Sequence, residues 1–522
     1  MPHDVPHDVI VIGGGHNGLT TAACLAQRGR RVLVLEANAR LGGLASSMEF
    51  HPGYKAPGIL HDTRLVPESI IQHLKLEEFG LRLHDKEIPC YAPEGQGRAL
   101  EGRGRGLKLF RDPERSLEEI SSFSSRDAER YREWRSFLDK ITPFIRELLV
   151  GPAPDILAEG WAQLWPLLKK GVALRRLGER EMMELLRIAP MCVADWLNEW
   201  FETPLLKALL AAPSLTGTWL GPWSAGSVAT LLFQECRAGS DIQGGPAALI
   251  DALEACCRSH GVELRTSAKV QRILVKQGQV QGVELESSET LPAPQVAASC
   301  DPCQAFLELL SPTQLPEKLA TAMRHWRTRG TTAKVHLALN GPLEFAGRPE
   351  EPLEKAHLAD TLDDLERAFD AVKYRSTSKR PYLDVWVPSI SAPSLAPEGH
   401  HVVSVLVSFA HHDLEGGWGE KQRQALGQQV LARLSEVAPT LQDHLVACEV
   451  ITPQDLAERF HLTGGHIHHG EHSLDQLLSL RPTALCCRYS TPVAGLTLCG
   501  SGCHPGGGIT CTPGFLAAQE MR

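Results

Sequence analysis

"DVIVIGGGHNGLTTAACLAQRGRRVLVLE", residues 8–36, is the stretch that decides the fold. Its apolar run 9–12 has the composition of a strand that is buried on both faces of a parallel sheet. Gly13, Gly15 and Gly18 follow in the spacing G-x-G-x-x-G, a helix is predicted to end near residue 29, and a second apolar strand ends at Glu36. Strand, glycines, helix, strand and acid in this register predict a dinucleotide-binding unit.

Each residue type in this motif has a physical reason. Gly13 permits a tight turn, Gly15 lets the backbone approach a pyrophosphate, and Gly18 allows the helix to pack closely on the strand. The helix N-terminus, with Asn17 in its first turn, offers free N–H groups and a partial positive charge to phosphates. Glu36 ends the second strand, where a carboxylate accepts hydrogen bonds from ribose hydroxyls.

The next residues favour FAD over NAD as the dinucleotide. In "ANARLGGLASS" (37–47), Arg40, Gly42 and Gly43 fit the R-x-G-G extension that lies beside the pyrophosphate in many flavoproteins. This half of the chain resembles the FAD-binding half of the amine oxidase and phytoene desaturase superfamily. A second dinucleotide loop is not expected at "GRGRG" (102–106), because no apolar strand precedes it and no helix follows.

The end of the chain carries the more specific part of the resemblance. "GLTLCGSGCHPGGGITCTPGFLAA" (495–518) looks like the strand, glycine-rich turn and helix that close over the ribityl chain and flavin ring in that superfamily. With "GTWLGPWSAGS" (217–227), "DIQGGPAALIDAL" (241–253) and "GGHIHHGEHSLDQLLSLRP" (464–482), it resembles bacterial phytoene desaturase-like proteins. It is similar to the group formed by pyridine nucleotide-disulfide oxidoreductase domain-containing protein 2 and its bacterial relatives. The FAD contacts that motif and resemblance together imply are Gly13, Gly15, Asn17, Gly18, Glu36, Ala37, Arg40, Gly42, Gly43, Leu44, Val270, Gly500, Ser501, Gly506, Gly507, Gly508 and Ile509.

The resemblance implies an α/β fold in which the FAD-binding domain is discontinuous. We expect a Rossmann-like parallel sheet with flanking helices from residues 1–65, 236–302 and 485–522. Residues 66–235 and 303–484 would form a mixed α+β substrate domain, with a sheet over the flavin and a helical flank. Residues 261–287 are read as three short strands, 331–340 and 401–410 as strands, and 116–141 as helix.

Composition excludes several classes of protein. A net charge of −9 and a pI near 6.2 leave no electrostatic footprint for nucleic acid. No run approaches the roughly 20 apolar residues of a membrane-spanning helix. The 14 cysteines show no short-period framework, which favours reduced thiols in the cytoplasm. The basic, Trp-rich stretch 160–180 either lies in a membrane interface, where an enzyme could draw apolar substrate from lipid, or packs on the substrate domain.

Two further constellations have simpler alternatives. Cys300 and Cys303 form a C-x-x-C that would suit a dithiol relay, but flavin disulfide reductases place their redox pair on the first helix after the FAD glycines. The resemblance makes it an ordinary turn. The histidines of 466–472 could bind metal, yet no second ligand group follows at zinc-like spacing, so we expect no metal.

The sequence therefore predicts an FAD-dependent oxidoreductase of the phytoene desaturase type. We expect its substrate to be an apolar, polyene- or isoprenoid-like small molecule that is dehydrogenated or isomerised at a C–C or C=C bond by hydride transfer to flavin. His504, His469 and Gln476 are the candidates for the catalytic residues that steer the proton. Two alternatives stay open: a reductive cyclase fed by NAD(P)H as a transient donor, and a non-catalytic FAD-carrying interaction protein.

Overall fold

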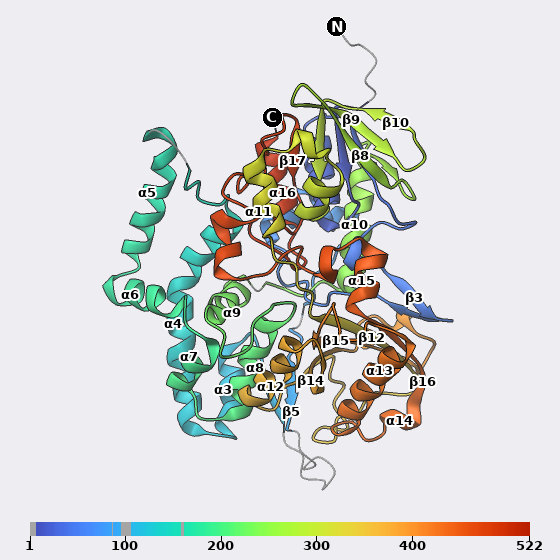
Figure 1. Cartoon of the computed structure of the whole chain (residues 1–522). Helices are drawn as coiled ribbons and strands as arrows, with labels where there is room; N and C mark the ends of the chain where they lie inside the picture. The colour runs from blue at the N-terminus through green and yellow to red at the C-terminus, as the bar shows by residue number, and fades with distance from the viewer. Residues whose placement is uncertain (1–6, 86, 95–105, 158–160, 238, 522) are drawn as a thin grey trace.

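The computed structural model describes residues 7–85, 87–94, 106–157, 161–237 and 239–521, except for the side chains of 161–163. Figure 1 shows a parallel sheet with its helices at one end of the molecule, a larger mixed sheet at the other end, and a helical flank beside them. The expected α/β fold class is therefore confirmed. Most of the "GRGRG" stretch at 102–106 lies outside the described residues.

The parallel sheet has the strand order β17-β11-β1-β2-β7. Its strands are β1 (Val9–Ile12), β2 (Val32–Leu35), β7 (Glu263–Arg265), β11 (Gln295–Ala298) and β17 (Leu496–Leu498). Val9 is opposite Val32 on one side and Gln295 on the other. Because β1 and β2 are buried throughout, their apolar runs are those of strands covered on both faces.

Helices α1 (His16–Gln27) and α10 (Gly245–Ser259) contact this sheet, and α16 (Thr512–Glu520) packs on α1. A second, antiparallel sheet of β8 (Val270–Lys276), β9 (Gln279–Leu285) and β10 (Thr290–Pro292) lies at the same end of the molecule (Figure 1). The parallel strands thus come from the beginning, middle and end of the chain. The predicted domain boundaries themselves stay a prediction.

The mixed sheet has the order β16-β12-β15-β14-β13-β5-β6 and is antiparallel except where β13 runs parallel to β5. Its strands are β5 (Cys90–Pro93), β6 (Gly106–Leu109), β12 (Thr332–Leu339), β13 (Lys355–Leu358), β14 (Thr377–Trp386), β15 (His401–Ala410) and β16 (Leu445–Ile451). A hairpin of β3 (Met48–His51) and β4 (Tyr54–Ala56) contacts β15. Helices α12 (Leu362–Lys373) and α13 (Glu420–Ser435) contact β14.

The helical flank is built from the helices between residues 113 and 235. They are α3 (Pro113–Ser121), α4 (Ser125–Val150), α5 (Trp161–Arg176), α6 (Glu179–Ile188), α7 (Val193–Trp200), α8 (Pro204–Leu215) and α9 (Ser227–Glu235). The helix predicted over 116–141 is in fact two, because Ser124 begins α4 as its N-cap and accepts a hydrogen bond from Asp127 N at 3.1 Å. The remaining helices are α2 (Glu68–His73), α11 (Glu317–Arg324), α14 (Leu441–His444) and α15 (Pro453–Phe460).

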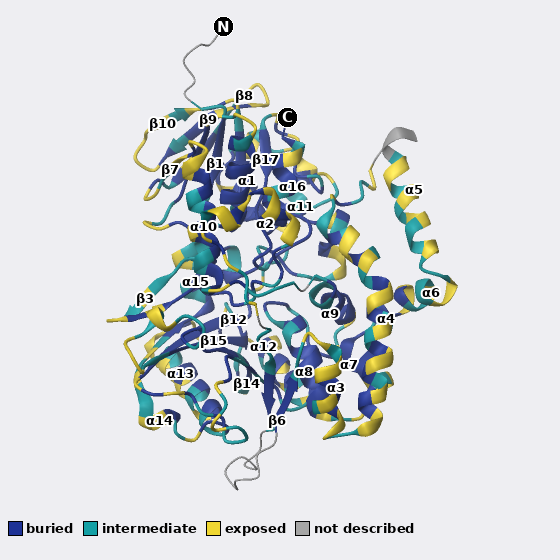
Figure 2. Ribbon diagram, turned by 180° about the vertical axis from the view of Figure 1, so that it is seen from behind, coloured by how far each residue is buried: buried dark blue, intermediate teal, exposed yellow. Residues whose placement is uncertain are grey.

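Helix α5 projects from this flank into solvent, and much of its surface is exposed (Figure 2). Trp165, Leu168 and Val172 are each about half exposed. Within the described ranges, we find no helix whose length and apolar character would let it cross a lipid bilayer.

Candidate functional site

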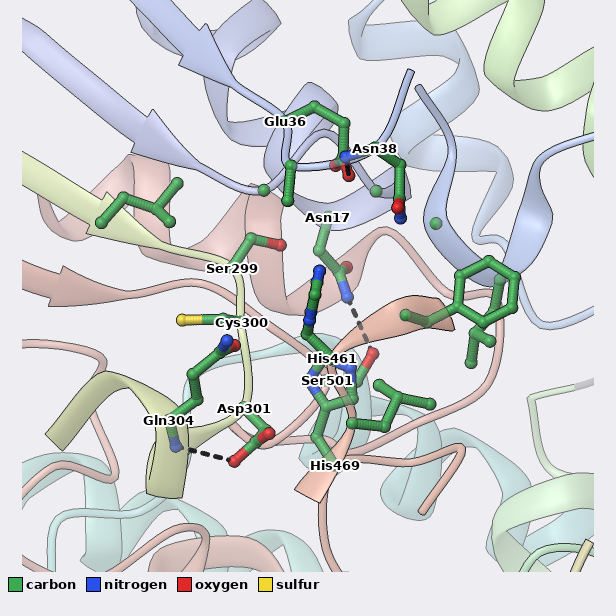
Figure 3. Close-up of a pocket in the computed structure, with 18 of the residues that line it drawn as sticks. Asn17, Glu36, Asn38, Ser299, Cys300, Asp301, Gln304, His461, His469 and Ser501 are labelled. Carbon is green, nitrogen blue, oxygen red and sulfur yellow. Dashed lines mark hydrogen bonds between the residues drawn. The ribbon is translucent and has the colours of Figure 1, made fainter. Parts of the chain in front are cut away.

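A first cavity lies at the carboxyl ends of β1, β2 and β11. In the sheet order, β2 lies on one side of β1 and β11 lies on the other, so the direction in which strands are added reverses at β1. Ligands of open α/β sheets bind at such a switch point. We call residues 499–511, between β17 and α16, the closing loop. Figure 3 shows how residues from α1, from the segments after β2 and β11, and from the closing loop face one another there. Most of the predicted FAD contacts line it: Gly13, Gly15, Asn17, Glu36, Ala37, Gly42, Gly43, Leu44, Val270 and Ser501.

The N-terminus of α1 opens toward this first cavity. Gly15 precedes the helix, and none of the described side chains caps it, so its first N–H groups are available to a ligand. Asn17 donates from Nδ2 to Ser501 Oγ at 3.1 Å, while its Oδ1 is buried with no partner among the described residues. His16 Nε2 is buried in the same unpartnered way, and burial lowers the pKa of His16 to about 4, so the ring is neutral at neutral pH.

Glu36 is held by the backbone rather than by a cation. Its Oε2 accepts a hydrogen bond from Gly14 N at 2.7 Å and its Oε1 accepts one from Asn38 N at 2.9 Å. Burial raises the pKa of Glu36, against the lowering effect of these N–H donors. The remaining lone pairs can accept from two neighbouring hydroxyls, as those of a ribose would require.

The motif glycines serve two different purposes. A Cβ on Gly18 would lie 2.0 Å from Gly13 O, so only glycine lets α1 approach the turn after β1. A Cβ on Gly15 would have Gly42 O, at 4.0 Å, as its nearest neighbour, so this glycine leaves open space toward the cavity. The first observation explains packing, and the second leaves room for a pyrophosphate.

The closing loop contributes less of its backbone to the cavities than we expected. A Cβ on Gly500 would meet Ser299 O, one on Gly506 would meet His472, and one on Gly507 would meet His468, so each of these glycines makes room for neighbouring protein atoms. Arg40 also lies outside both cavities and donates to Ser47 O at 3.2 Å. Gly508 and Ile509 line a second cavity.

The second cavity shares the wall residues Leu60 and Ile467 with the first. It lies between the closing loop, the end of α8 and strands β13, β14 and β15 of the mixed sheet. Much of its wall is apolar: Leu60, Leu65, Pro213, Trp386, Leu406, Ile467 and Ile509. The rest is largely ionisable or polar: His61, Asp62, Arg64, Thr216, Gln234, Lys355, His357, Asp384 and His468.

None of the predicted site residues belongs to this polar wall. Behind it lies Lys334, which is fully buried on β12 and contacts His61 Nε2 through Nζ. Burial lowers the pKa of Lys334 well below its ordinary value. The local signal in the sequence was a charged residue inside each of two apolar strands, in "TTAKVHLALN" (331–340) and in "PYLDVWV" (381–387).

The three residues predicted to handle protons lie in different places. His469 lines the first cavity, its Nδ1 is buried without a hydrogen bond to any described residue, and burial lowers its pKa to about 4. His504 instead lies with Nε2 at 3.0 Å from Leu148 O and 3.1 Å from Gly151 O, at the end of α4. The Gln476 side chain forms two hydrogen bonds with the backbone of Arg327: Oε1 accepts from Arg327 N at 2.9 Å, and Nε2 donates to Arg327 O at 3.1 Å. Neither His504 nor Gln476 lines either cavity.

The C-x-x-C pair does not have the environment of a redox dithiol. Burial raises the pKa of Cys300 well above its ordinary value and that of Cys303 to about 12, so both thiols stay protonated at neutral pH. Cys303 Sγ donates to Met323 O at 3.6 Å. Cys300 lines the first cavity as part of the turn after β11.

The chain matches the model of one protein family, flavin containing amine oxidoreductase, over residues 18–514. It belongs to this family, and it is an FAD-dependent oxidoreductase of the phytoene desaturase-like kind.

Three relatives align with nearly the whole chain. Pyridine nucleotide-disulfide oxidoreductase domain-containing protein 2 of Rattus norvegicus is 32% identical, covering 98% of this chain and 93% of the relative. A limonene dehydrogenase component of Castellaniella defragrans is 27% identical, covering 98% and 94%. Hydroxyneurosporene desaturase of Rubrivivax gelatinosus is 25% identical, covering 99% and 93%. Among solved structures, putrescine oxidase bound to putrescine matches with a TM-score of 0.60 and 14% identity, over 98% of this chain and 97% of that one, which supports the fold alone.

Proposed function

We propose that this flavoenzyme dehydrogenates or isomerises a C–C or C=C bond of an isoprenoid-like small molecule with a mainly apolar body. One observation carries the proposal: the dinucleotide cavity lies beside a second, partly apolar cavity and shares the wall residues Leu60 and Ile467 with it. A cofactor held along the first cavity would present its far end to a molecule in the second.

The donors and acceptors of the first cavity fit FAD. The uncapped N-terminus of α1 and the open face of Gly15 would hold the pyrophosphate, Glu36 the ribose hydroxyls, and Val270 the adenine. Asn17 Oδ1 is a buried polar atom that the described residues leave unsatisfied. Bound FAD supplies a hydride acceptor, and the protein supplies position and a water-poor surrounding.

The chain's own residues would do the rest. Leu60 and Ile467 form an apolar wall shared by the two cavities, and Ile509 adds to the apolar wall of the second, which would exclude water from a reacting C–H bond. Of the three predicted proton-handling residues, His469 is the one that lines a cavity, and because this is the cofactor's cavity it would act from the cofactor's side of the shared wall. Its ring is neutral, and its Nδ1, which has no partner among the described residues, is available to hydrogen-bond where the proton is released.

The names of two relatives support the substrate class. Limonene and hydroxyneurosporene are both isoprenoids, and the relatives are named as a dehydrogenase and a desaturase. Both align over almost the whole of this chain, so the similarity includes the segments that build the second cavity.

Anaerobic spectroscopy of the purified flavoprotein tests the proposal. We expect isoprenoid substrates to bleach the flavin bands and NADPH to leave them unchanged, with His469→Gln slowing the bleaching while flavin stays bound. Rapid bleaching by NADPH would favour the reductive cyclase. Bands that neither isoprenoids nor nicotinamide can bleach would favour the non-catalytic FAD carrier.

We also propose that α5 contacts the membrane surface from which such a substrate would come. The exposed apolar side chains Trp165, Leu168 and Val172 lie on a helix that also exposes Lys169, Arg175 and Arg176, a combination suited to anionic lipid. Co-sedimentation with phosphatidylglycerol vesicles should fall when Trp165 and Leu168 are both changed to Ser. Equal sedimentation of the wild type and this variant would contradict the contact.

A further inference from the structure

The polar wall of the second cavity is more than a hydrocarbon substrate requires. His61 and His357, from the loop before α2 and from β13, lie on either side of Asp384 of β14. A ligand made only of carbon and hydrogen would leave these groups desolvated and unsatisfied, which costs free energy for every unpaired polar atom. The wall therefore points to a ligand with a polar group.

Asp384 is the centre of this wall. Tyr382, Asp384 and Trp386 alternate along β14 and so share one face of the strand, and Trp386 also lines the cavity. Asp384 Oδ1 lies 3.7 Å from His61 Nδ1 and 3.8 Å from His357 Nδ1, both beyond hydrogen-bond distance. Its side chain is 21% exposed, and this exposure is to the cavity that it lines.

Both imidazoles already contact another side chain. His61 Nε2 contacts Lys334, and His357 Nδ1 lies 2.6 Å from Tyr382 Oη. His61 is 6% exposed, and its Nδ1 has no hydrogen-bond partner among the described residues. Burial lowers the pKa of His61 to about 4 and also lowers that of His357, while the charge of Asp384 acts in the opposite direction on both rings.

Asp384 is nevertheless a carboxylate. Burial alone would raise its pKa, but His357, His61 and Lys334 outweigh burial and hold the pKa below its ordinary range. The nearby cations of the cavity wall already have carboxylate partners. Arg64 Nη2 lies 2.9 Å from Asp62 Oδ2, and Lys355 Nζ lies 2.5 Å from Asp241 Oδ1.

We propose that the second cavity binds an amphipathic substrate, whose hydroxyl or ammonium group donates hydrogen bonds to Asp384 between His61 and His357 while its apolar body lies toward Leu60 and Ile467. This inference rests on the proposed function, because it names the substrate class of the same cavity. A hydroxyl and an ammonium share the donor chemistry that the carboxylate needs. An anionic group is disfavoured, since it would face Asp384 while Arg64 and Lys355 are already paired.

Four probes with one terpene skeleton test this inference. Limonene, perillyl alcohol, perillylamine and perillic acid differ at a single carbon, which carries a methyl, hydroxymethyl, aminomethyl or carboxylate group. Their dissociation constants are measured on the purified flavoprotein by perturbation of the flavin spectrum and by equilibrium dialysis. We expect the alcohol or the amine to bind at least about tenfold more tightly than limonene, and the acid to bind most weakly. The stronger of the two donors identifies hydroxyl or ammonium as the preferred group.

Variants assign the preference to the carboxylate. Asp384→Asn should reduce the preference for the donor probes to about threefold or less, whereas Asp384→Glu, which keeps the charge, should retain most of it. Asp363→Asn is the matched control, because Asp363 is exposed in the first turn of α12, away from the cavity. Melting temperature and flavin content establish that each variant is folded.

The outcomes separate this inference from the proposed function. A protein without flavin contradicts the proposed function before any probe is added. If flavin is bound, three results overturn the donor subsite while leaving the flavoenzyme intact. They are that limonene binds as tightly as the alcohol and the amine, that the acid binds most tightly, or that none of the four probes binds. An unchanged preference in Asp384→Asn, with the variant folded, overturns it equally.

Discussion

Replacing Arg481 by methionine should loosen both cavities together. Arg481 is fully buried, and the groups that accept its hydrogen bonds are backbone carbonyls. Nη1 donates to Glu471 O at 2.9 Å and Gln476 O at 3.2 Å. Nη2 donates to His468 O at 2.7 Å, Gly470 O at 3.3 Å and Ser501 O at 2.9 Å.

Arg481 connects the segment 468–476, which contains three histidines, with Ser501 of the closing loop through these hydrogen bonds. His468 lines the second cavity and Ser501 lines the first. Methionine would leave these carbonyls buried without a donor, at roughly 1–1.5 kcal/mol for each. Together the five carbonyls cost about 5–7.5 kcal/mol, of which relief of the buried charge returns about 2–3 kcal/mol, so the net loss of unfolding free energy is about 3–5 kcal/mol. If the chain unfolds as one unit, this lowers the melting temperature by about 3–5 °C.

Flavin content per chain and the melting temperature measure the effect of Arg481→Met. Arg488→Met is the control, because Arg488 is 38% exposed and pairs with Glu520, and a surface pair contributes at most about 1 kcal/mol. We expect Arg481→Met to lose flavin on gel filtration while Arg488→Met retains it. A variant of Arg481 that keeps its flavin and melts within about 1 °C of the wild type, well short of the expected shift, would refute this reasoning.

Three further predictions concern the cofactor cavity and its surroundings. Gly18→Ala should abolish flavin binding, because the new Cβ would lie 2.0 Å from Gly13 O, whereas Gly171→Ala, which meets nothing within 4 Å, should leave the flavin content unchanged. Glu36→Ala should weaken FAD binding to the apoprotein by roughly tenfold to a hundredfold in a fluorescence titration, because charge-assisted hydrogen bonds to ribose are lost; equal affinity would argue against a ribose contact. Stability should also fall in acid. Burial holds the pKa of His504 at about 4, against about 6.5 in the unfolded chain, so its contribution is complete above pH 6.5 and is lost as the pH falls toward 4. This one residue accounts for about 3 kcal/mol of the free energy of unfolding over that range. In urea unfolding, the free energy of unfolding should therefore change less between pH 7 and pH 5 in His504→Gln than in the wild type.

The sequence predicts the parallel sheet well because the signals are local. The apolar run 9–12, the glycines after it and the acid at Glu36 all lie within one short βαβ unit. The break between α3 and α4 also had a local signal, since Ser124 followed by Asp127 has the pattern of a helix start. A helical pattern over 116–141 hid this break, because apolar residues on both sides of it keep helical spacing.

The substrate end could not be predicted in the same way. His61 and Asp384 lie far apart in the sequence and meet only because β14 lies beside the loop before α2, so no spacing in the sequence connects them. The resemblance places Gly506 and Gly507 near the flavin, and that placement stays a prediction. Their sequence neighbours do not show that a Cβ on either glycine would meet His472 or His468, because these histidines come from another segment of the chain.

The absorption spectrum of the purified protein tests the central claim most directly. After reconstitution with FAD and gel filtration, we expect flavin bands at one FAD per chain. Gly18→Ala prepared in the same way should show none. A wild-type protein that leaves the column without flavin bands would contradict the assignment of the cavity at Gly15, Glu36 and Ser501 to FAD.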